Sequence, residues 1–422
     1  MRRIPATTLS LAIAATISAT LSIHGFAVQS HSNQPVYSPY PPGLIPSDLP
    51  SETRRVNAEI DRSERMALAE WRALPANGGT AMRRQQLLGK LELYDKHLSV
   101  NRNQACTFCH MPYTGFSGPI SSLNNTVAAY PGSVHYRFGK RKPQAYTYSP
   151  YYPVLHYNRT QSTFYGGNFR DLRATGEQAG WELFRGKGMC NTCHLDGTGN
   201  TFQNGRRGSG SVSAADAAGL APLFTDFTSS NLGLPRNPDN PFYYQNKPDR
   251  YNLTPNPQGP AFVDFGVGLF LRGLSGTPPD SNWAQHKSGF DGHMQVSTVR
   301  NVDMRPYPEF VKSYMHNGYL KSLKEVVHFY NTRDKYKTPA SGCPAGTEKV
   351  TCWPPAEVPG PTVDQTVGNL GLTDQEEDLI VVFLKTLTDG CTRPYTDFDS
   401  FQGAVPINDP VCVAAQRQSA PQ

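Results

Sequence analysis

The sequence contains two copies of the motif Cys-x-x-Cys-His, and no other feature limits so strongly what this chain can form. The two copies are Cys106-Thr107-Phe108-Cys109-His110 and Cys190-Asn191-Thr192-Cys193-His194. Two thiols at this spacing can add to the two vinyl groups of one haem, and the adjacent histidine then lies beneath the iron as its proximal ligand. A random chain of this composition would hold only about 0.004 such matches. The pattern therefore predicts two covalently bound haem c groups.

Two other uses of such cysteine pairs are a zinc site and a thioredoxin-type redox pair. Zinc would require two further ligands at a compatible spacing for each motif. A redox pair needs no histidine and would favour a single copy. The presence of two complete motifs in one chain favours haem over both alternatives.

The N-terminus, residues 1–27, has the form of a secretory signal peptide. It has a basic start, a mostly apolar run from Leu9 to Ile23, and small residues up to Ala27. An N-terminal membrane anchor is the alternative, but the run is short for a span and polar residues interrupt it. We expect cleavage after Ala27, a Pro- and Ser-rich leader over 28–52, and a periplasmic protein, in agreement with covalent haem attachment outside the cytoplasm.

The net charge of the full chain is +6. Removal of residues 1–27 takes away Arg2 and Arg3 and no acid, which leaves +4. This charge is too small to indicate a nucleic-acid partner. No later run of about 18 apolar residues occurs, so we expect a soluble mature protein without a stable membrane span.

Four cysteines lie outside the two motifs and are expected to pair in an oxidising compartment. They are Cys343, Cys352, Cys391 and Cys412. Three pairings are open, and we favour Cys343–Cys352 with Cys391–Cys412 because each then closes a short loop.

Helical periodicity marks five segments. The first begins at Ser51, and in it Val56 and Ile60 are four positions apart. The other four span 82–98, 176–184, 322–330 and 373–387. The last two open with the capping-box patterns Ser322 to Glu325 and Thr373 to Glu376.

No strand alternation is long enough to predict a sheet, and residues 195–290 are rich in Gly, Pro and Asn, which indicates irregular structure. The predicted class is mainly α, with two cytochrome-c-like haem domains and long loops. We expect the first domain at 53–175, the second at 176–392 and a C-terminal tail at 393–422.

In five blocks the sequence resembles the di-haem cytochrome c peroxidase family, which includes the MauG-like enzymes. The blocks are LLGKLELYDKHLSVNRNQACTFCH (87–110), GGNFRDLRATG (166–176), GWELFRGKGMCNTCH (180–194), PLFTDFTSSNLGLPRNP (222–238) and VSTVRNV with SYMHNGYLKSLKEVVHFY (296–330). The resemblance implies one haem in each domain and often a calcium ion between the domains. One haem receives electrons from a small donor protein, such as a cytochrome c or a cupredoxin, and the other cleaves hydrogen peroxide. A homodimer is compatible with the resemblance, and MauG-like members oxidise a substrate protein instead.

The resemblance also implies distal ligands. Peroxidases of the family carry a methionine at the sixth position of the second haem, and MauG-like members carry a tyrosine. Tyr330 falls at this position, with Met315 as the second candidate. For the first haem, the nearest candidate is His135, before a basic turn, and His156 is a weaker one.

The sequence departs from the family pattern at three places. Arg170 stands where the family has a tryptophan that carries electrons between the haems. Most of the stretch with the distal acid/base glutamate is absent, and Glu177 and Gln178 are either its remnant or the first turn of the helix before the second motif. The calcium-binding positions hold Lys142 and the triplet around Lys312, which puts a calcium ion in question.

Two functions follow as hypotheses. The first is a peroxidase or MauG-like oxidase, in which the haem of His110 meets peroxide, with Glu177 and Gln178 as acid/base candidates, and the haem of His194 and Tyr330 stores or passes electrons. The second is a non-enzymatic electron carrier or redox sensor that has lost the acid/base loop. A deletion in the gene would be a third explanation of the short segment.

Overall fold

Helices make up most of the regular structure in a computed structural model of the chain, as predicted. The structure describes residues 40–74, 81–145, 156–158, 163–165, 175–195, 202–203, 206–207, 224–226, 228–249, 251–274 and 283–388. The signal peptide, Arg170, the C-terminal tail and the pair Cys391–Cys412 lie outside these ranges, so the predictions for them stay predictions.

The α-helices are α1 (Leu49–Arg72), α2 (Ala81–Tyr94), α3 (Ser121–Asn125), α4 (Thr175–Arg185), α6 (Val267–Gly273), α7 (Leu323–Thr332) and α8 (Asp374–Thr386). The 3-10 turns are Lys96–Leu98, Cys106–Phe108, Pro112–Thr114, Cys190–Thr192, Pro241–Tyr244, Gly259–Ala261 and Trp283–Phe290. The strands are β1 (His156–Asn158), β2 (Thr163–Tyr165), β3 (Phe202–Gln203), β4 (Arg206–Arg207), β5 (Ser229–Ser230) and β6 (Met294–Gln295). They form three two-stranded antiparallel sheets: β1 with β2, β3 with β4, and β5 with β6. No helix among the described residues is long and apolar enough to cross a membrane.

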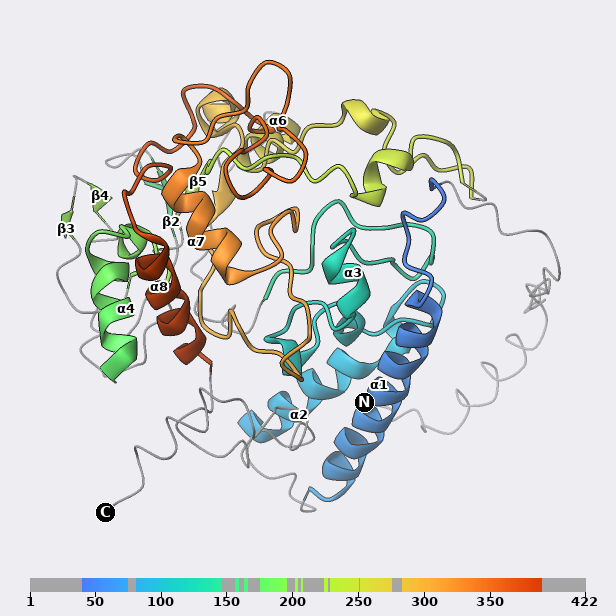
Figure 1. The fold of residues 1–422 in the computed structure, drawn as a ribbon. Coiled ribbons are helices and arrows are strands. Elements are labelled where there is room, and N and C mark those ends of the chain that lie inside the picture. The colour runs from blue at the N-terminus through green and yellow to red at the C-terminus, as the bar shows by residue number, and fades with distance from the viewer. Residues whose placement is uncertain are drawn as a thin grey trace, which may run out of the picture. The chain divides into compact units, whose positions relative to one another are not determined.

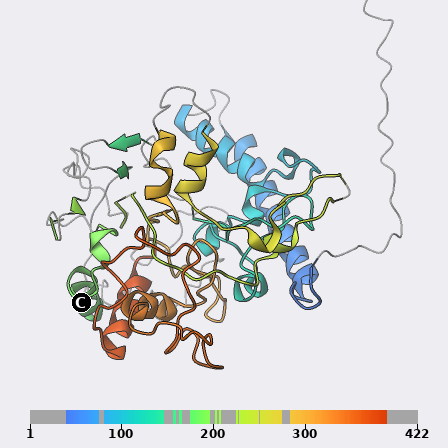
Figure 2. The same cartoon turned by 90° about the horizontal axis from the view of Figure 1, so that it is seen from above.

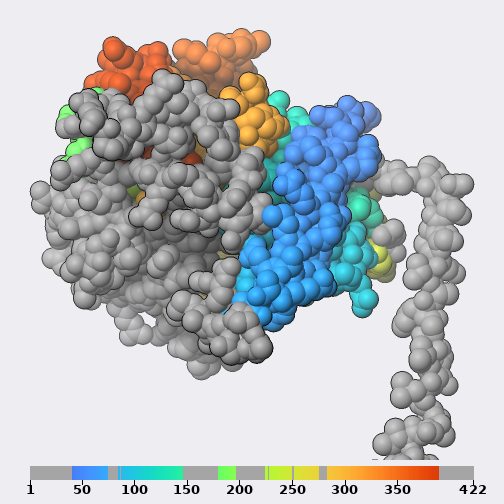
Figure 3. All heavy atoms as spheres, turned by 90° about the horizontal axis from the view of Figure 1, so that it is seen from below, coloured from blue at the N-terminus to red at the C-terminus, as the bar shows by residue number. Residues whose placement is uncertain are grey.

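The first helical segment confirms the predicted periodicity. In α1, Val56, Ile60 and Ala67 are fully buried and lie on one stripe of the helix. The outer side of α1 stays on the surface along its length (Figure 3). The prediction of a single helix over 82–98 is wrong at its end, because α2 stops at Tyr94. The Asp95 carboxylate accepts a hydrogen bond from the backbone N–H of His97 and starts a separate 3-10 turn.

The helix before the second motif packs against the last helix of the described chain (Figure 1). Gly180 makes this possible, since a Cβ at that position would overlap the carbonyl oxygen of Leu379 and crowd Phe383. The N-terminus of α8 has the complete predicted capping box between Thr373 and Glu376. At α7, Ser322 caps the helix as predicted, but the Glu325 carboxylate accepts from the backbone N–H of Lys321.

The buried apolar side chains form two large clusters. One gathers residues between Tyr40 and Phe138, around α1 and the first motif. The other gathers residues between Phe184 and Leu387, from α4, α7 and α8. One cluster thus lies around each motif, and the boundary between two haem domains stays a prediction.

The segment 195–290 is less irregular than predicted. In it, α6 and the 3-10 turn at Trp283–Phe290 lie side by side (Figure 2), and Leu271 packs against Phe290 between them. Tertiary contact stabilises α6, which is too short to be stable alone.

A disulfide joins Cys343 to Cys352, which confirms this half of the predicted pairing. The two cysteines are nine positions apart, and closing a loop of this size stabilises a protein by roughly 2–3 kcal/mol. We expect the double variant Cys343→Ala with Cys352→Ala to lose about that free energy of unfolding, measured by urea denaturation of the holoprotein. An unchanged midpoint would mean that the surrounding loop holds its shape without the bond.

Candidate functional site

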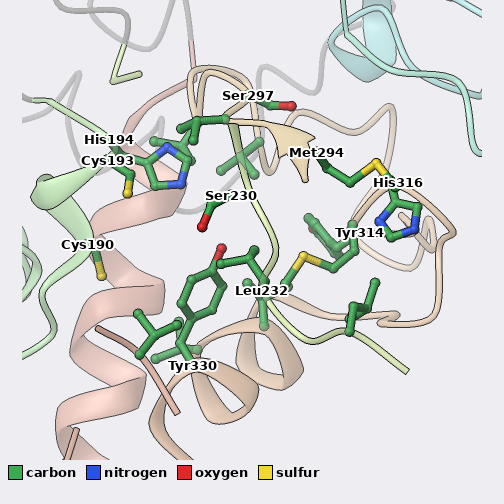
Figure 4. Close-up of a pocket in the computed structure, with 18 of the residues that line it drawn as sticks. Cys190, Cys193, His194, Ser230, Leu232, Met294, Ser297, Tyr314, His316 and Tyr330 are labelled. Carbon is green, nitrogen blue, oxygen red and sulfur yellow. The ribbon is translucent and has the colours of Figure 1, made fainter. Parts of the chain in front are cut away.

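A cavity of about 630 Å³ lies beside the second Cys-x-x-Cys-His motif. Cys190, Cys193 and His194 line one side of it, and Tyr330 of α7 faces them from the other (Figure 4). Much of the remaining lining is apolar, and part of it comes from α7 and α8. A largely apolar cavity next to two cysteines outside any disulfide and a histidine suits a haem group.

The second motif forms a short 3-10 turn that presents its histidine to the cavity. The backbone N–H of His194 donates to the carbonyl oxygen of Cys190 at 2.9 Å. Nδ1 of the His194 ring lies 2.9 Å from the carbonyl oxygen of Phe224 and donates to it, which leaves Nε2 as the metal-binding atom. Burial lowers the pKa of His194, so the ring is neutral, as an iron ligand must be.

Tyr330 is held with its hydroxyl in the cavity. The neighbouring Phe329 is fully buried in the core, and Figure 4 shows the Tyr330 ring directed toward the same space as the His194 ring. Burial raises the pKa of Tyr330, and the Cys193 and Cys190 thiols add to this shift. The phenol is therefore neutral unless a cation such as ferric iron stabilises its anion. Met315 also lines the cavity, so both candidate ligands reach it.

The first motif repeats the geometry of the second. The backbone N–H of His110 donates to the carbonyl oxygen of Cys106 at 3.0 Å. Nδ1 of His110 lies 2.8 Å from the carbonyl oxygen of Gln144 and 3.2 Å from that of Phe116. Burial lowers the pKa of His110, which keeps the ring neutral with Nε2 available to a metal. Gly115, Ser117, Gln144 and Ala145, which follow this motif, line the far part of the same cavity.

The structure does not bring His135 to the cavity. Its ring is exposed, and its Nε2 lies 3.0 Å from Nδ2 of Asn103. The structure places the backbone of the weaker candidate, His156, in β1. Glu177 and Gln178 lie in the first turn of α4, which is one of the two readings of the sequence. Their catalytic role stays a prediction.

His316 lines the same cavity, although nothing in the sequence singled it out as a ligand. Its Nε2 atom is buried without a hydrogen-bond partner in the described part of the chain, and burial lowers the pKa of the ring to about 4. The neighbouring Asn317 closes the turn by accepting from the N–H of Tyr319 and donating to Pro235. The His-Asn-Gly pattern in a tight turn was the signal that could have identified a fixed histidine here.

An ion pair between the partly exposed Arg141 and the buried Asp264 lies at the same side of the cavity. The guanidinium of Arg141 donates to both carboxylate oxygens of Asp264, each at 2.6 Å. Burial raises the pKa of Asp264, but Arg141 outweighs this, and the net pKa lies below its usual value. This pair links the segment after the first motif to the loop before α6.

No group of three or more His, Cys, Asp or Glu side chains within the described ranges is arranged to hold a metal ion. Among these residues, neither motif has the additional ligands of these types that zinc requires. Each has, in contrast, the two thiols and the single oriented histidine that haem c requires.

Comparison with known proteins agrees with this geometry. The chain is 23% identical over 440 residues to the cytochrome-c peroxidase IdrP1 of Denitromonas iodatirespirans, covering 90% of this chain and 92% of that protein. The crystal structure of the diheme peroxidase BthA from Burkholderia thailandensis matches with a TM-score of 0.50 and 20% identity, covering 73% of this chain and 87% of that chain. A MauG-like protein associated with microbial copper homeostasis matches with a TM-score of 0.42 and 18% identity over 75% of this chain and 91% of that one. No family model matches the chain.

The fold is thus that of the di-haem peroxidases, and the two motifs predict that the haem groups are attached covalently. The resemblance to the di-haem cytochrome c peroxidases is confirmed, and with it the expectation of a peroxidase-like oxidoreductase with two haem groups.

Proposed function

We propose that this protein is a periplasmic di-haem c-type cytochrome that reduces hydrogen peroxide with electrons from a small donor protein. The reaction breaks the O–O bond of one peroxide, takes up two donor electrons and two protons, and releases two waters. A cytochrome c or a cupredoxin is the proposed donor. The observation that carries the proposal is the repeated geometry of His110 and His194, each with Nδ1 bound to backbone oxygen and Nε2 left for iron.

The two haem sites have different proposed roles. Cys190 and Cys193 would hold the second haem, and His194 and Tyr330 would be its two iron ligands from the protein. With both positions taken, this site would store or pass electrons and would not bind peroxide. Cys106 and Cys109 would hold the first haem, with His110 as its proximal ligand. When bound, the first haem supplies the iron chemistry that cleaves peroxide.

The residues of this chain set the orientation and the charge of the ligands at the second site. The backbone carbonyl of Phe224 accepts the Nδ1–H of His194 and so fixes the ring orientation. Tyr330 would bind as a phenolate, and the proton it loses would have to leave the cavity. A phenolate favours oxidised iron, which fits a site that is hard to reduce.

A specific observation favours the non-enzymatic alternative, an electron carrier or redox sensor. The two acid/base candidates lie on the 11-residue helix α4, which leads into the second motif rather than the first. A peroxidase without a distal acid/base would break the O–O bond slowly.

Stopped-flow mixing of the fully reduced holoprotein with hydrogen peroxide separates the two functions. We expect rapid reoxidation of both haems and sustained turnover when reduced cytochrome c or a reduced cupredoxin is supplied. If reoxidation is no faster than that of a simple c-type cytochrome and neither donor gives turnover, the peroxidase proposal is wrong and the electron carrier is favoured.

A further inference from the structure

The ammonium group of Lys312 sits in a cage of backbone carbonyl oxygens. Nζ donates to the carbonyl oxygens of Thr114 and Met304 at 2.8 Å each, and to that of Asn301 at 3.3 Å. The Lys312 side chain is buried. An ammonium has three N–H donors and no acceptor, so three carbonyl oxygens satisfy it completely.

Such a cage of carbonyl oxygens resembles the environment of a bound inorganic cation. A calcium ion is usually held by six to eight oxygen atoms, several of them from carboxylates. Here the carbonyl oxygens already bind an ammonium, and the nearby carboxylate of Asp303 pairs with Arg305. A second buried ammonium, that of Lys142, lies close enough to lower the pKa of Lys312. A divalent cation would meet two positive charges at this place.

The residues present therefore do not fit the calcium ion that the family resemblance implies. We propose that the Lys312 ammonium replaces that ion as a built-in cation, and that it positions the loop carrying the contacts of His110. This inference does not depend on the proposed peroxide reaction.

Burial lowers the pKa of Lys312 to about 7, and the carboxylate of Asp303 opposes this shift. The hydrogen-bond pattern favours the charged form, because a neutral amine has only two N–H donors for three carbonyl oxygens. The geometry is thus that of an ammonium.

One compact loop, residues 111–117, connects the Lys312 contact to the first haem site. Lys312 holds the carbonyl of Thr114, whose hydroxyl oxygen lies 2.8 Å from the carbonyl of Met111 and 2.7 Å from that of Ser117. Two residues beyond Thr114, the carbonyl oxygen of Phe116 is an acceptor for Nδ1 of His110. Lys312 is a positioning residue for the iron ligand, and it does not contact the haem motif itself.

The loop that carries Thr114 packs closely against the 301–304 loop. Gly115 has φ of +68°, and a Cβ there would lie 2.8 Å from the carbonyl oxygen of Asn301. A larger residue would therefore separate the Thr114 loop from the 301–304 loop, and the two loops supply all three carbonyl oxygens.

The chain offers a matched control in Lys321. Its Nζ is also shielded and donates to two backbone carbonyls, those of Asn124 at 2.9 Å and Thr126 at 2.7 Å. Burial lowers its pKa to about 8, as it does for Lys142. Lys321 does not line the cavity, and its two acceptors, Asn124 and Thr126, lie outside the segment from Thr114 to Phe116 that Lys312 holds.

The test uses the holoprotein after dialysis against EGTA. Metal analysis should find no stoichiometric calcium, and the midpoint of thermal unfolding should be the same with EGTA and with millimolar calcium chloride. Lys312→Met and Lys321→Met should both lower that midpoint by several degrees, because each leaves backbone carbonyls without a donor. Only Lys312→Met should also shift the reduction potential of the first haem.

Retained calcium, or a higher unfolding midpoint in calcium, would overturn the proposal, and both measurements need only the unaltered protein. Equal effects of the two substitutions on the first-haem potential would overturn the positioning role. So would an unchanged potential in a folded Lys312→Met protein. If Lys312→Met does not fold, the milder Lys312→Gln variant keeps two N–H donors on a neutral amide and allows the same measurement.

Discussion

Replacing Tyr330 by methionine is expected to raise the reduction potential of the second haem by on the order of 0.1 V or more. A phenolate stabilises ferric iron because it is a charged oxygen ligand, whereas a thioether favours the ferrous state. The cavity has room for the substitution, because Tyr330 points into it from α7 (Figure 4) and methionine is the smaller side chain. Spectroelectrochemical titration of the two haems would measure the shift.

Tyr319→Phe is the matched control for this change. Tyr319 is buried in the same apolar cluster, but its hydroxyl donates to Glu348 at 2.5 Å and not to the cavity. We expect this variant to leave both potentials unchanged. An unaltered potential in Tyr330→Met would reject Tyr330 as the ligand, and Met315→Leu would then test the second candidate that lines the cavity.

Removal of the proximal ligand of the first haem by His110→Ala is expected to lower peroxide turnover at least about 100-fold. The carbonyls of Gln144 and Phe116 fix the orientation of this ring, and the substitution removes the ligand that they hold in place. Steady-state oxidation of a reduced donor would measure the loss. His97→Ala is the control, because His97 is exposed and paired only with Asp95. Unchanged turnover in His110→Ala would assign peroxide chemistry to the other haem.

The same assay decides the role of Glu177. Loss of a true acid/base group costs about 10²–10⁴-fold in rate. The place of Glu177 in the first turn of α4 leads us to expect a change of less than about tenfold for Glu177→Gln. Glu182→Gln, on the same helix, is the matched control. A large loss confined to Glu177→Gln would make it the remnant of the family's acid/base residue.

Several features were predictable because they depend on short-range chemistry. The Cys343–Cys352 bond closes a loop of nine positions, and the Thr373 capping box needs only residues three positions apart. The end of α2 was missed for a related reason: a single Asp95 carboxylate bonds to the backbone of His97 and ends the helical pattern.

The candidate site depended more on the tertiary structure. Periodicity placed Tyr330 on the apolar face of its helix, but helical spacing alone does not distinguish a core tyrosine from one that faces a cavity. The carbonyl cage of Lys312 joins residues that are far apart in the chain, since Thr114 lies 198 positions before Lys312. Sequence spacing contains no signal for such contacts, because carbonyl oxygens are present at every position.

The two Cys-x-x-Cys-His motifs by themselves determined the predicted cofactor, since thiols three positions apart and an adjacent histidine are a local arrangement that needs no distant partner. Only the tertiary structure decided what surrounds each motif. It placed Tyr330 opposite His194 across one cavity, left His135 at the surface and surrounded the Lys312 ammonium with backbone carbonyl oxygens. The physical reason is that burial and hydrogen-bond satisfaction are properties of the packed chain, and both are decided by segments that lie far apart in the sequence.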